Sequence, residues 1–155
     1  MDYPAETNLF QIAHACLIGN SYRQLLGKEL IPEARSDQDF ARLLFYAPFA
    51  VLSHDTSADP LFNYANLKGL ELFELSWQEL CVLPSRLSAE AVKQADRESV
   101  LNKVKDKGYI DNYQAIRIAK TGRRFSIKNT EVWNLYDADK SYQGQAACIR
   151  QWQYL

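Results

Sequence analysis

The first hydrophobic pattern along the chain is helical. Between residues 5 and 27 the apolar side chains recur three or four positions apart, and Gly27 follows the last of them. This spacing predicts an amphipathic helix of about five turns that ends at Gly27. The polar segment after it contains Pro32 and is typical of a connector, although a short second helix could begin at Ser36 or Asp37. We therefore divide the chain into an N-terminal helix and connector, residues 1–35, and a main domain, residues 36–155.

The pattern then changes to that of a β-hairpin. The run LLFYAPFAVLSHD, residues 43–55, is rich in aromatic and branched side chains, and PLFNYAN, residues 60–66, resumes it after the turn TSAD. Asn66 is placed to cap a helix that begins directly after the second strand. Ser76 and Glu79 form a Ser-x-x-Glu capping box for a further helical turn. The change from strand to helix at Asn66 is therefore a capping device.

The second half of the chain contains one long helix and three strands. The helix is predicted from Ser88, as its cap, to Gly108, as its stop, with Val92, Val100 and Val104 on its apolar side. Three strand-like runs follow at residues 109–119, 123–137 and 142–152, separated by the turns KTG and ADKS.

The order of elements fixes the fold class. Strands and helices do not alternate along the chain, so a parallel doubly wound sheet is disfavoured. Two strands, short helices, one long helix and three strands instead predict an α+β fold. We expect a five-stranded antiparallel sheet with helices on one face, preceded by the N-terminal amphipathic helix.

Composition and charge narrow the function classes. The chain has 155 residues, of which 47% are hydrophobic, enough for one substantial core. The formal net charge of −1 gives no electrostatic footprint for nucleic acid or an anionic membrane. No apolar run approaches the length of a membrane span, and the N-terminus lacks a signal-peptide pattern. We therefore expect a cytoplasmic protein that binds neither nucleic acid nor membranes.

The three cysteines do not suggest a redox or metal site. Cys16, Cys81 and Cys148 are odd in number, far apart and without a CxxC pair, and the chain has only two histidines. This argues against a disulfide framework and against zinc. We interpret the cysteines as buried thiols.

The segment from residue 47 to residue 80 resembles the opening of PAS sensor domains. In those domains a strand ends in Tyr-Ala-Asn and the following helices close with Phe and Ser-x-x-Glu-Leu. The corresponding residues of this chain are Tyr64, Ala65, Asn66, Phe73, Ser76, Glu79 and Leu80.

Several longer blocks resemble the MEKHLA domain, a PAS-related family. They include LFYAPFAVLSHD, ADPLFNYAN, LPSRLSAE, GYIDNYQAIRI and VWNLYD, and together such blocks span most of residues 43–150. The resemblance implies a PAS-like fold and says little about chemistry. Many PAS proteins carry a dimerisation helix outside the PAS core, which is where the N-terminal helix of this chain lies.

The known cofactor chemistries of PAS domains do not match this sequence. Flavin-binding photosensory domains need an Asn-Cys-Arg-Phe-Leu-Gln block, whereas the corresponding region here reads LCVLPSRLS, with Cys81 too early. Haem-binding domains take a histidine from the long helix, and residues 88–107 contain no His, Cys or Met. No cofactor is therefore assigned.

A catalytic role finds little support in the sequence. A small cone-shaped dehydratase or isomerase fold would also suit a chain of this length, but it needs an acid and a base that converge in a pocket. Ser53, His54 and Asp55 are consecutive on a strand, so neighbouring members point to opposite faces. His54 is instead interpreted as a hydrogen-bonded turn histidine. We predict that the protein is not an enzyme.

A ligand cavity between the sheet and the short helices is the remaining candidate site. Such cavities are mostly apolar, with a few polar groups that orient the ligand. The candidate residues are Asn63, Tyr64, Trp77, Arg86, Tyr113, Arg117, Trp133, Asn134 and Gln145. For the aromatic residues plain core packing is the competing interpretation. Arg86 and Arg117 differ, because a charge on an apolar face needs an anionic partner, which could be an acidic residue of the same chain.

These observations predict a stand-alone PAS-like sensory domain. It would bind a small molecule and signal in trans, as a homodimer formed through the N-terminal helix or the sheet, or through another partner. The first alternative is a dimerisation module whose core is filled by side chains and holds no ligand. The second is the small dehydratase or isomerase.

Overall fold

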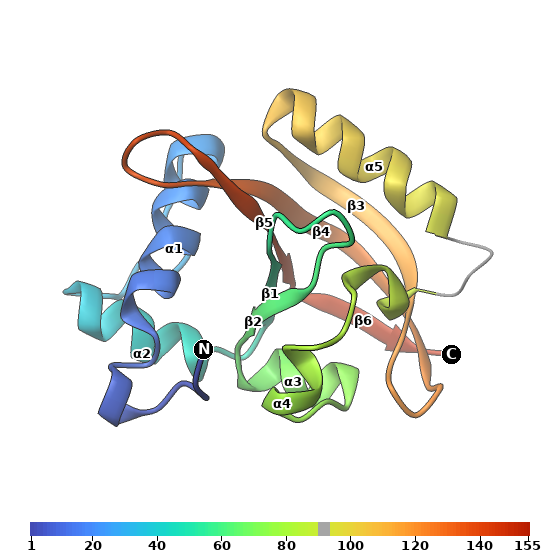
Figure 1. Ribbon diagram of the computed structural model, residues 1–155, viewed down its shortest axis with the longest axis horizontal. Coiled ribbons are helices and arrows are strands. Elements are labelled where there is room, and N and C mark those ends of the chain that lie inside the picture. Colours follow the sequence, from blue (N-terminus) through green and yellow to red (C-terminus); the bar gives the residue numbers. More distant parts are fainter. Residues whose placement is uncertain (90–93) are drawn as a thin grey trace.

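The computed structural model describes residues 1–89 and 94–155 of the chain (Figure 1). Its helices are α1 (Ile12–Leu26), α2 (Asp37–Phe45), α3 (Leu67–Phe73), α4 (Trp77–Leu80) and α5 (Gln94–Lys107), with short 3-10 helices η1 (Glu6–Asn8) and η2 (Ser85–Ser88). Its strands are β1 (Ala50–His54), β2 (Phe62–Ala65), β3 (Tyr109–Ile118), β4 (Arg124–Tyr136), β5 (Tyr142–Ile149) and β6 (Gln151–Tyr154). No helix of these described residues is long and apolar enough to cross a membrane.

The strands form one antiparallel sheet in the order β2-β1-β5-β4-β3, with β6 also paired to β4. The predicted α+β fold is confirmed, and the described residues form six strands where five were expected. The last predicted strand divides at Arg150: β5 pairs with β4 at residues 131–136, and β6 pairs with β4 at residues 125–128. Between these two stretches Asn129 has a positive φ of 51°, which interrupts the regular pairing.

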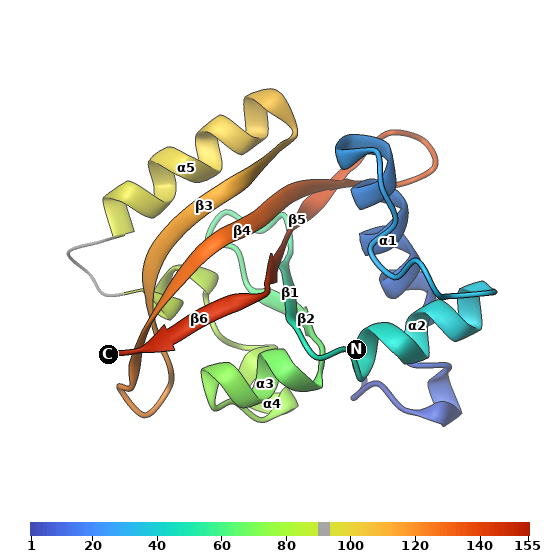
Figure 2. The same cartoon turned by 180° about the vertical axis from the view of Figure 1, so that it is seen from behind.

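The two faces of the sheet carry different helices. Consecutive residues of a strand point to opposite faces. On β4 the Trp133 indole donates to the carbonyl of Ile18 in α1, whereas the amide of Asn134 donates to the carbonyl of Val104 in α5. Helix α1 therefore covers one face, and α5 lies over the other. Figures 1 and 2 show α1 and α2 together on one side of the molecule and α5 on the other.

Helix α1 is shorter than the predicted helix of residues 5–27. Leu9, Phe10 and Gln11 all have positive φ values, between 53° and 56°, which a right-handed helix does not allow. This break turns the Phe10 ring into the core, where it packs against Phe45. The predicted end is confirmed, since Gly27 takes the left-handed conformation with φ of 73°.

Residues 43–45 belong to a helix and not to the predicted first strand. The Ser36 hydroxyl accepts a hydrogen bond from the Asp39 amide and caps α2, as the possible second helix required. Ala41, Leu44 and Phe45 are then buried at helical spacing. The branched and aromatic side chains that suggested a strand are the buried face of this helix, and β1 begins only at Ala50.

Asn66 caps α3 and also joins it to α2, to β1 and to the connection between them, so the predicted capping device is confirmed and extended. Its side-chain oxygen accepts from the amides of Gly69 and Val51, both at 2.9 Å. Its amide group donates to the carbonyls of Leu44 at 3.0 Å and Phe49 at 2.8 Å. The capping box of Ser76 and Glu79 is confirmed as well.

The start of the long helix differs from the prediction. Ser88 ends η2, and its hydroxyl donates to the Ser85 carbonyl at 2.7 Å. Helix α5 is described from Gln94, and Val92 lies outside the described residues. Gly108, with φ of 94°, follows the last residue of α5 as predicted.

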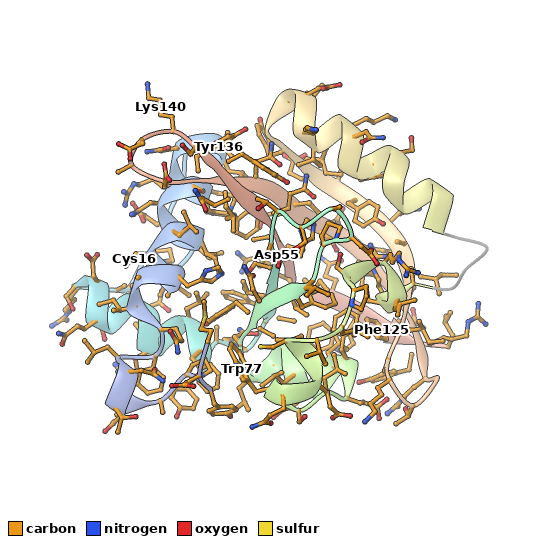
Figure 3. All side chains as sticks on the ribbon, in the orientation of Figure 1. Cys16, Asp55, Trp77, Phe125, Tyr136 and Lys140 are labelled. Carbon is orange, nitrogen blue, oxygen red and sulfur yellow. The ribbon has the colours of Figure 1, made fainter. Side chains whose placement is uncertain are left out.

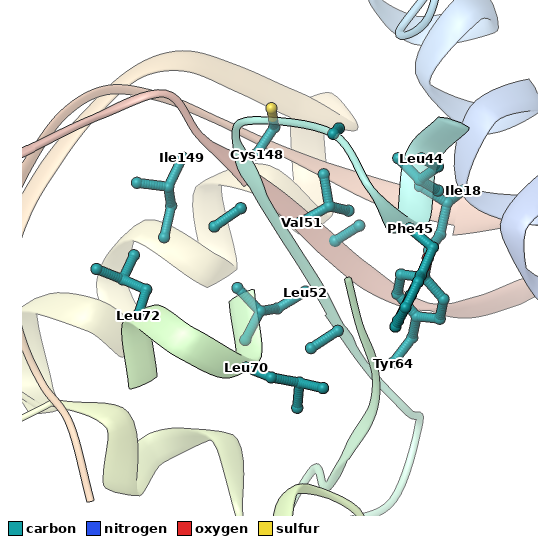
Figure 4. Close-up of a cluster of buried hydrophobic side chains, with 14 of the residues drawn as sticks. Ile18, Leu44, Phe45, Val51, Leu52, Tyr64, Leu70, Leu72, Cys148 and Ile149 are labelled. Carbon is teal, nitrogen blue, oxygen red and sulfur yellow. The ribbon is translucent and has the colours of Figure 1, made fainter. Parts of the chain in front are cut away.

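The core occupies both faces of the sheet. Figure 3 draws the side chains on the ribbon, and Figure 4 shows a cluster of the buried ones. Leu52 of β1, Leu70 and Leu72 of α3, and Ile149 of β5 are buried in one cluster. Ile18, Tyr22 and Trp133 are buried under α1. The sheet is thus the middle layer, and the candidate site lies between it and the helices opposite α1.

Candidate functional site

A small cavity lies on the sheet face opposite α1. Its volume is about 70 Å³, and most of its lining is apolar. The apolar residues come from the sheet, α3 and α5 and include Leu52, Phe62, Phe73, Val100, Ile127, Val132, Ala147 and Ile149. The polar residues are Ser53, His54, Ser88, Tyr113, Arg117, Thr130 and Gln145.

Arg117 is the charged group of this lining. Its side chain is carried by β3, and the residue is only 9% exposed. Its Nη2 donates to the hydroxyl of Tyr113 at 2.7 Å, and the guanidinium lies 5.3 Å from the centre of the Tyr113 ring. Burial lowers the pKa of Arg117, because it disfavours the charged form. Among the side chains that the structure describes, which leave out those of residues 90–98 and 101, no carboxylate pairs with this guanidinium.

Arg86 meets the expectation of an acidic partner in the same chain. Its Nε lies 3.1 Å from Asp59 Oδ1, in an ion pair that is about half exposed. Arg86 is on η2 and lies outside the cavity lining. The two arginines that the sequence grouped together therefore have different surroundings.

Gln145 and Asn134 connect the cavity to α5. Gln145 lines the cavity and donates from Nε2 to Asn134 Oδ1 at 3.0 Å. Asn134 Nδ2 in turn donates to the Val104 carbonyl at 3.2 Å and to the Tyr136 hydroxyl at 3.1 Å. Tyr113, Arg117 and Gln145 thus lie in the cavity wall, with Asn134 directly behind it.

The other predicted site residues lie elsewhere. Trp133 packs against Tyr22 of α1 on the opposite face, with ring centres 4.8 Å apart. Tyr64 is buried against His14, and Trp77 donates to the Met1 carbonyl at 2.9 Å. Asn63 accepts from the Ser53 hydroxyl at 2.6 Å. Their assignment to a ligand site stays a prediction, and none of these residues lines the cavity.

Thr130 and His54 line the cavity but were not among the predicted site residues. Thr130 is fully buried, and its hydroxyl has no hydrogen-bond partner in the part of the chain that the structure describes. Side chains alternate between the two faces of a strand, so Thr130 and Val132 lie on the same face as Asn134. This alternation in the sequence could have identified Thr130 as a cavity residue. His54 Nδ1 lies 3.0 Å from the Asp55 carbonyl, so the predicted hydrogen bonding is present, but His54 is the last residue of strand β1 and does not belong to a turn.

A wider groove adjoins the cavity along β3. It has a volume of about 530 Å³ and shares Val100, Tyr113, Arg117 and Ile127 with the cavity. The remainder of its lining is partly polar and includes Lys103 of α5 and Lys128 of β4. The pair of Arg117 and Tyr113 therefore stands between the groove and the cavity.

A serine and a histidine do meet, but not as a catalytic pair. Ser53 Oγ donates its proton to Asn63, so at 2.8 Å His14 Nε2 is the donor to Ser53. Because Nε2 carries the proton in this contact, His14 cannot accept the proton of Ser53. Catalysis by a serine–histidine pair would require the histidine to accept it. Burial also lowers the pKa of His14 to about 4.

The three cysteines are free in the structure, and Cys148 is buried. Burial raises the pKa of Cys148 to about 12 and also raises the pKa values of Cys16 and Cys81. Low-pKa thiolates are what reactive and metal-binding cysteines require. Among the described residues, no group of His, Cys, Asp or Glu side chains could hold a metal ion.

The architecture defines the class of protein, a PAS-like domain. The PAS domain of a protein from Colwellia psychrerythraea has a similar fold, with a TM-score of 0.61, 18% identity, and coverage of 72% of this chain and 92% of that one. An RNA-binding light-oxygen-voltage receptor gives a TM-score of 0.64 at 16% identity, over 80% of this chain and 35% of the receptor. The light-state dimer of the fungal blue-light photoreceptor Vivid gives a TM-score of 0.55 at 14% identity, over 68% of this chain and 78% of that chain.

Within that class, the sequence model of the MEKHLA domain matches residues 12–154, and the chain belongs to the MEKHLA domain family. It is 26% identical over 137 residues to homeobox-leucine zipper protein HOX10 of Oryza sativa subsp. indica, which covers 87% of this chain and 16% of that protein. It is also 24% identical over 137 residues to homeobox-leucine zipper protein REVOLUTA of Arabidopsis thaliana, and this match covers 85% of this chain and 16% of that protein. The chain spans 16% of the length of these two relatives.

Proposed function

We propose that this MEKHLA chain is a sensory domain that binds a small molecule in the cavity beneath α5 and η2. The observation that carries the proposal is Arg117, a guanidinium 9% exposed that faces a mostly apolar space. Protein interiors rarely bury a charged group unless it is paired or has a function. An oriented polar group in an apolar cavity is typical of a ligand site.

The sheet supplies a route from the cavity to α1. Thr130 and Asn134 of β4 face the cavity side, whereas Glu131 and Trp133, their neighbours in sequence, contact α1. A ligand that shifts the register or twist of β4 would therefore change the contacts of α1 directly. Packed elements with two discrete arrangements carry such coupling.

The output we propose is association with a second copy or with another protein, through α1 or the sheet. One structural neighbour, the photoreceptor Vivid, is described as a light-state dimer. In this chain β2 and β3 are the outer strands of the sheet order, and an outer strand offers unpaired backbone groups to a partner. The cytoplasmic location stays a prediction.

A second candidate is an interaction module that holds no ligand. The observation that favours it is the small volume of the cavity, about 70 Å³, beside a core that contains Phe125, Trp133 and Leu135. We propose no catalytic function, because the Ser53 proton is directed to Asn63 and away from His14.

Filling the cavity tests the first candidate against the second. Ala147 lines the cavity, so Ala147→Leu would occupy its space, and Ala138→Leu, at an exposed position of the β4–β5 turn, is the matched control. Non-denaturing mass spectrometry of the purified protein is expected to show a bound small molecule in the wild type and in Ala138→Leu but not in Ala147→Leu. A wild type without bound mass, together with an Ala147→Leu variant that is more stable than the wild type, would favour the module with a filled core.

A further inference from the structure

The guanidinium of Arg117 has more hydrogen-bonding capacity than its surroundings use. An arginine side chain carries five N–H donors in a planar fork. In the described part of the chain, the acceptor for Arg117 is the Tyr113 hydroxyl, a group that is not a carboxylate. A buried cation without an anion is strongly unfavourable, whereas an anion that enters the site removes much of that penalty.

A second polar group of the same wall is also unsatisfied. Thr130 lies opposite Tyr113 in the pairing of β3 with β4, and both residues line the cavity. The Thr130 hydroxyl is buried and has no hydrogen bond to any group that the structure describes. A hydroxyl can donate to an anionic oxygen as well as accept, so it would complement the guanidinium in holding an anion.

The volume of the cavity limits the ligand. An engineered apolar cavity of about 150 Å³ accepts benzene, which has six carbon atoms. By the same proportion a space of about 70 Å³ holds about three non-hydrogen atoms, and the groove that shares Tyr113 and Arg117 with the cavity leaves room for about one or two more. Acetate and propionate have this size.

From these observations we infer that the cavity binds a short-chain monocarboxylate. The carboxylate pairs with the fork of Arg117, and the hydrocarbon end lies against apolar residues such as Leu52 and Val132. A planar carboxylate matches the guanidinium geometry in a two-point contact. This inference rests on the proposed function, because it names the ligand class for the same cavity.

The groove beside β3 provides the approach. Groove and cavity share Val100, Tyr113, Arg117 and Ile127, so a carboxylate that crosses from one to the other meets Arg117 at the boundary. Lys103 lines the groove but not the cavity, which makes it the matched control for charge outside the site.

The test is thermal unfolding at pH 7 with sodium propionate, compared with propionamide and with sodium chloride at equal concentration. Propionate is expected to raise the unfolding midpoint of the wild type by about 5 °C at about 100 times its Kd. Propionamide and chloride are expected to leave it unchanged. Arg117→Met is expected to abolish the response to propionate, and Lys103→Met to retain it.

Other results would overturn the inference. An equal response to propionamide, or a full response in Arg117→Met, would reject the carboxylate while leaving a ligand of another class in the cavity. If Lys103→Met loses the response to propionate and Arg117→Met keeps it, the carboxylate binds in the groove and not in the cavity. If Arg117→Met does not fold, Ala147→Leu serves instead: a propionate response that persists with the cavity filled rejects the site. No response of the wild type also rejects the carboxylate, and the mass measurement on Ala147→Leu then decides the proposed function separately.

Discussion

The hydroxyl of Tyr22 on α1 donates to Oε2 of Glu131 on β4 at 2.8 Å, across 109 positions of sequence. Glu131 is buried, and it also pairs with Lys28 at 2.9 Å and Arg150 at 3.6 Å. Burial, followed by the bond to Glu131, raises the pKa of Tyr22 to about 12. This cluster holds the N-terminal helix on the sheet, so it lies on the route by which the cavity would reach α1.

Removal of the Tyr22 hydroxyl should weaken that attachment. Tyr22→Phe keeps the ring that packs on Trp133 and deletes a hydrogen bond to a charged group, so we expect a loss of about 1.5–3 kcal/mol in the free energy of unfolding. Urea titration measures it, with Tyr46→Phe, 57% exposed, as the control. A loss below about 0.5 kcal/mol would show that the cluster does not hold α1.

Asn66 should be among the most sensitive polar positions in the chain. Asn66→Ala removes a helix cap and leaves backbone groups of β1 and of the α2–β1 connection without partners, so we expect a loss of about 3 kcal/mol or more. Asn66→Asp keeps the acceptor for Gly69 and Val51 but places a carboxylate beside two carbonyls, and should be at least as harmful. The control is Asn102→Ala, at an exposed position of α5. Equal losses for Asn66→Ala and Asn102→Ala would refute the joining role.

The stability of the protein should fall as the medium becomes acidic, because of His14. Burial lowers the pKa of His14 from 6.5 to about 4 in the folded protein. Between these values the unfolded chain binds a proton that the folded chain does not, so stability decreases as the pH falls from about 6.5 to about 4. The accumulated effect is about 3 kcal/mol.

Replacement of the histidine checks this effect. His14→Gln can still donate to Ser53 but does not titrate, so the difference in unfolding free energy between wild type and variant should shrink or reverse as the pH falls to about 4. Chemical denaturation at a series of pH values measures the difference. A difference that is constant over this range would mean that His14 titrates alike in both states.

Gly144 should tolerate no side chain. A Cβ at this position would lie 2.0 Å from the backbone oxygen of His54, and φ is 126°. Gly122 has φ of 92°, but a Cβ there would meet no atom within 4 Å, so this position isolates the strain of the backbone alone. Gly122→Ala should lose about 1–2 kcal/mol, whereas Gly144→Ala must push β1 and β5 apart and should lose more than about 3 kcal/mol. Similar losses of unfolding free energy in the two variants would contradict the close approach of Gly144 to the His54 backbone oxygen.

The parts of the fold that depend on local chemistry could be predicted from the sequence. The caps at Asn66 and Ser76 and the stops at Gly27 and Gly108 each need only neighbouring residues. The antiparallel α+β fold followed from the pattern of elements along the chain and from the family resemblance. Helix α2 was hidden because its buried face consists of residue types that also favour strands.

Contacts between distant segments could not be predicted. Three consecutive left-handed residues at Leu9, Phe10 and Gln11 are stabilised by tertiary packing of Phe10, for which no local pattern exists. The contact between His14 and Ser53 joins positions 39 residues apart. Of the candidate site residues, those on β3 and β5 could be assigned to the cavity, because strand alternation fixes the face once the sheet order is known.

The most direct test of the account is hydrogen exchange of the backbone amides of α1 with and without saturating propionate. If ligand binding in the cavity changes the contacts of α1 through β4, propionate should change the exchange rates of residues 12–26 in the wild type. It should leave them unchanged in Arg117→Met. An effect confined to β3 and α5, or an equal effect on α1 in both proteins, would contradict the claim that a ligand at Arg117 is sensed by the N-terminal helix.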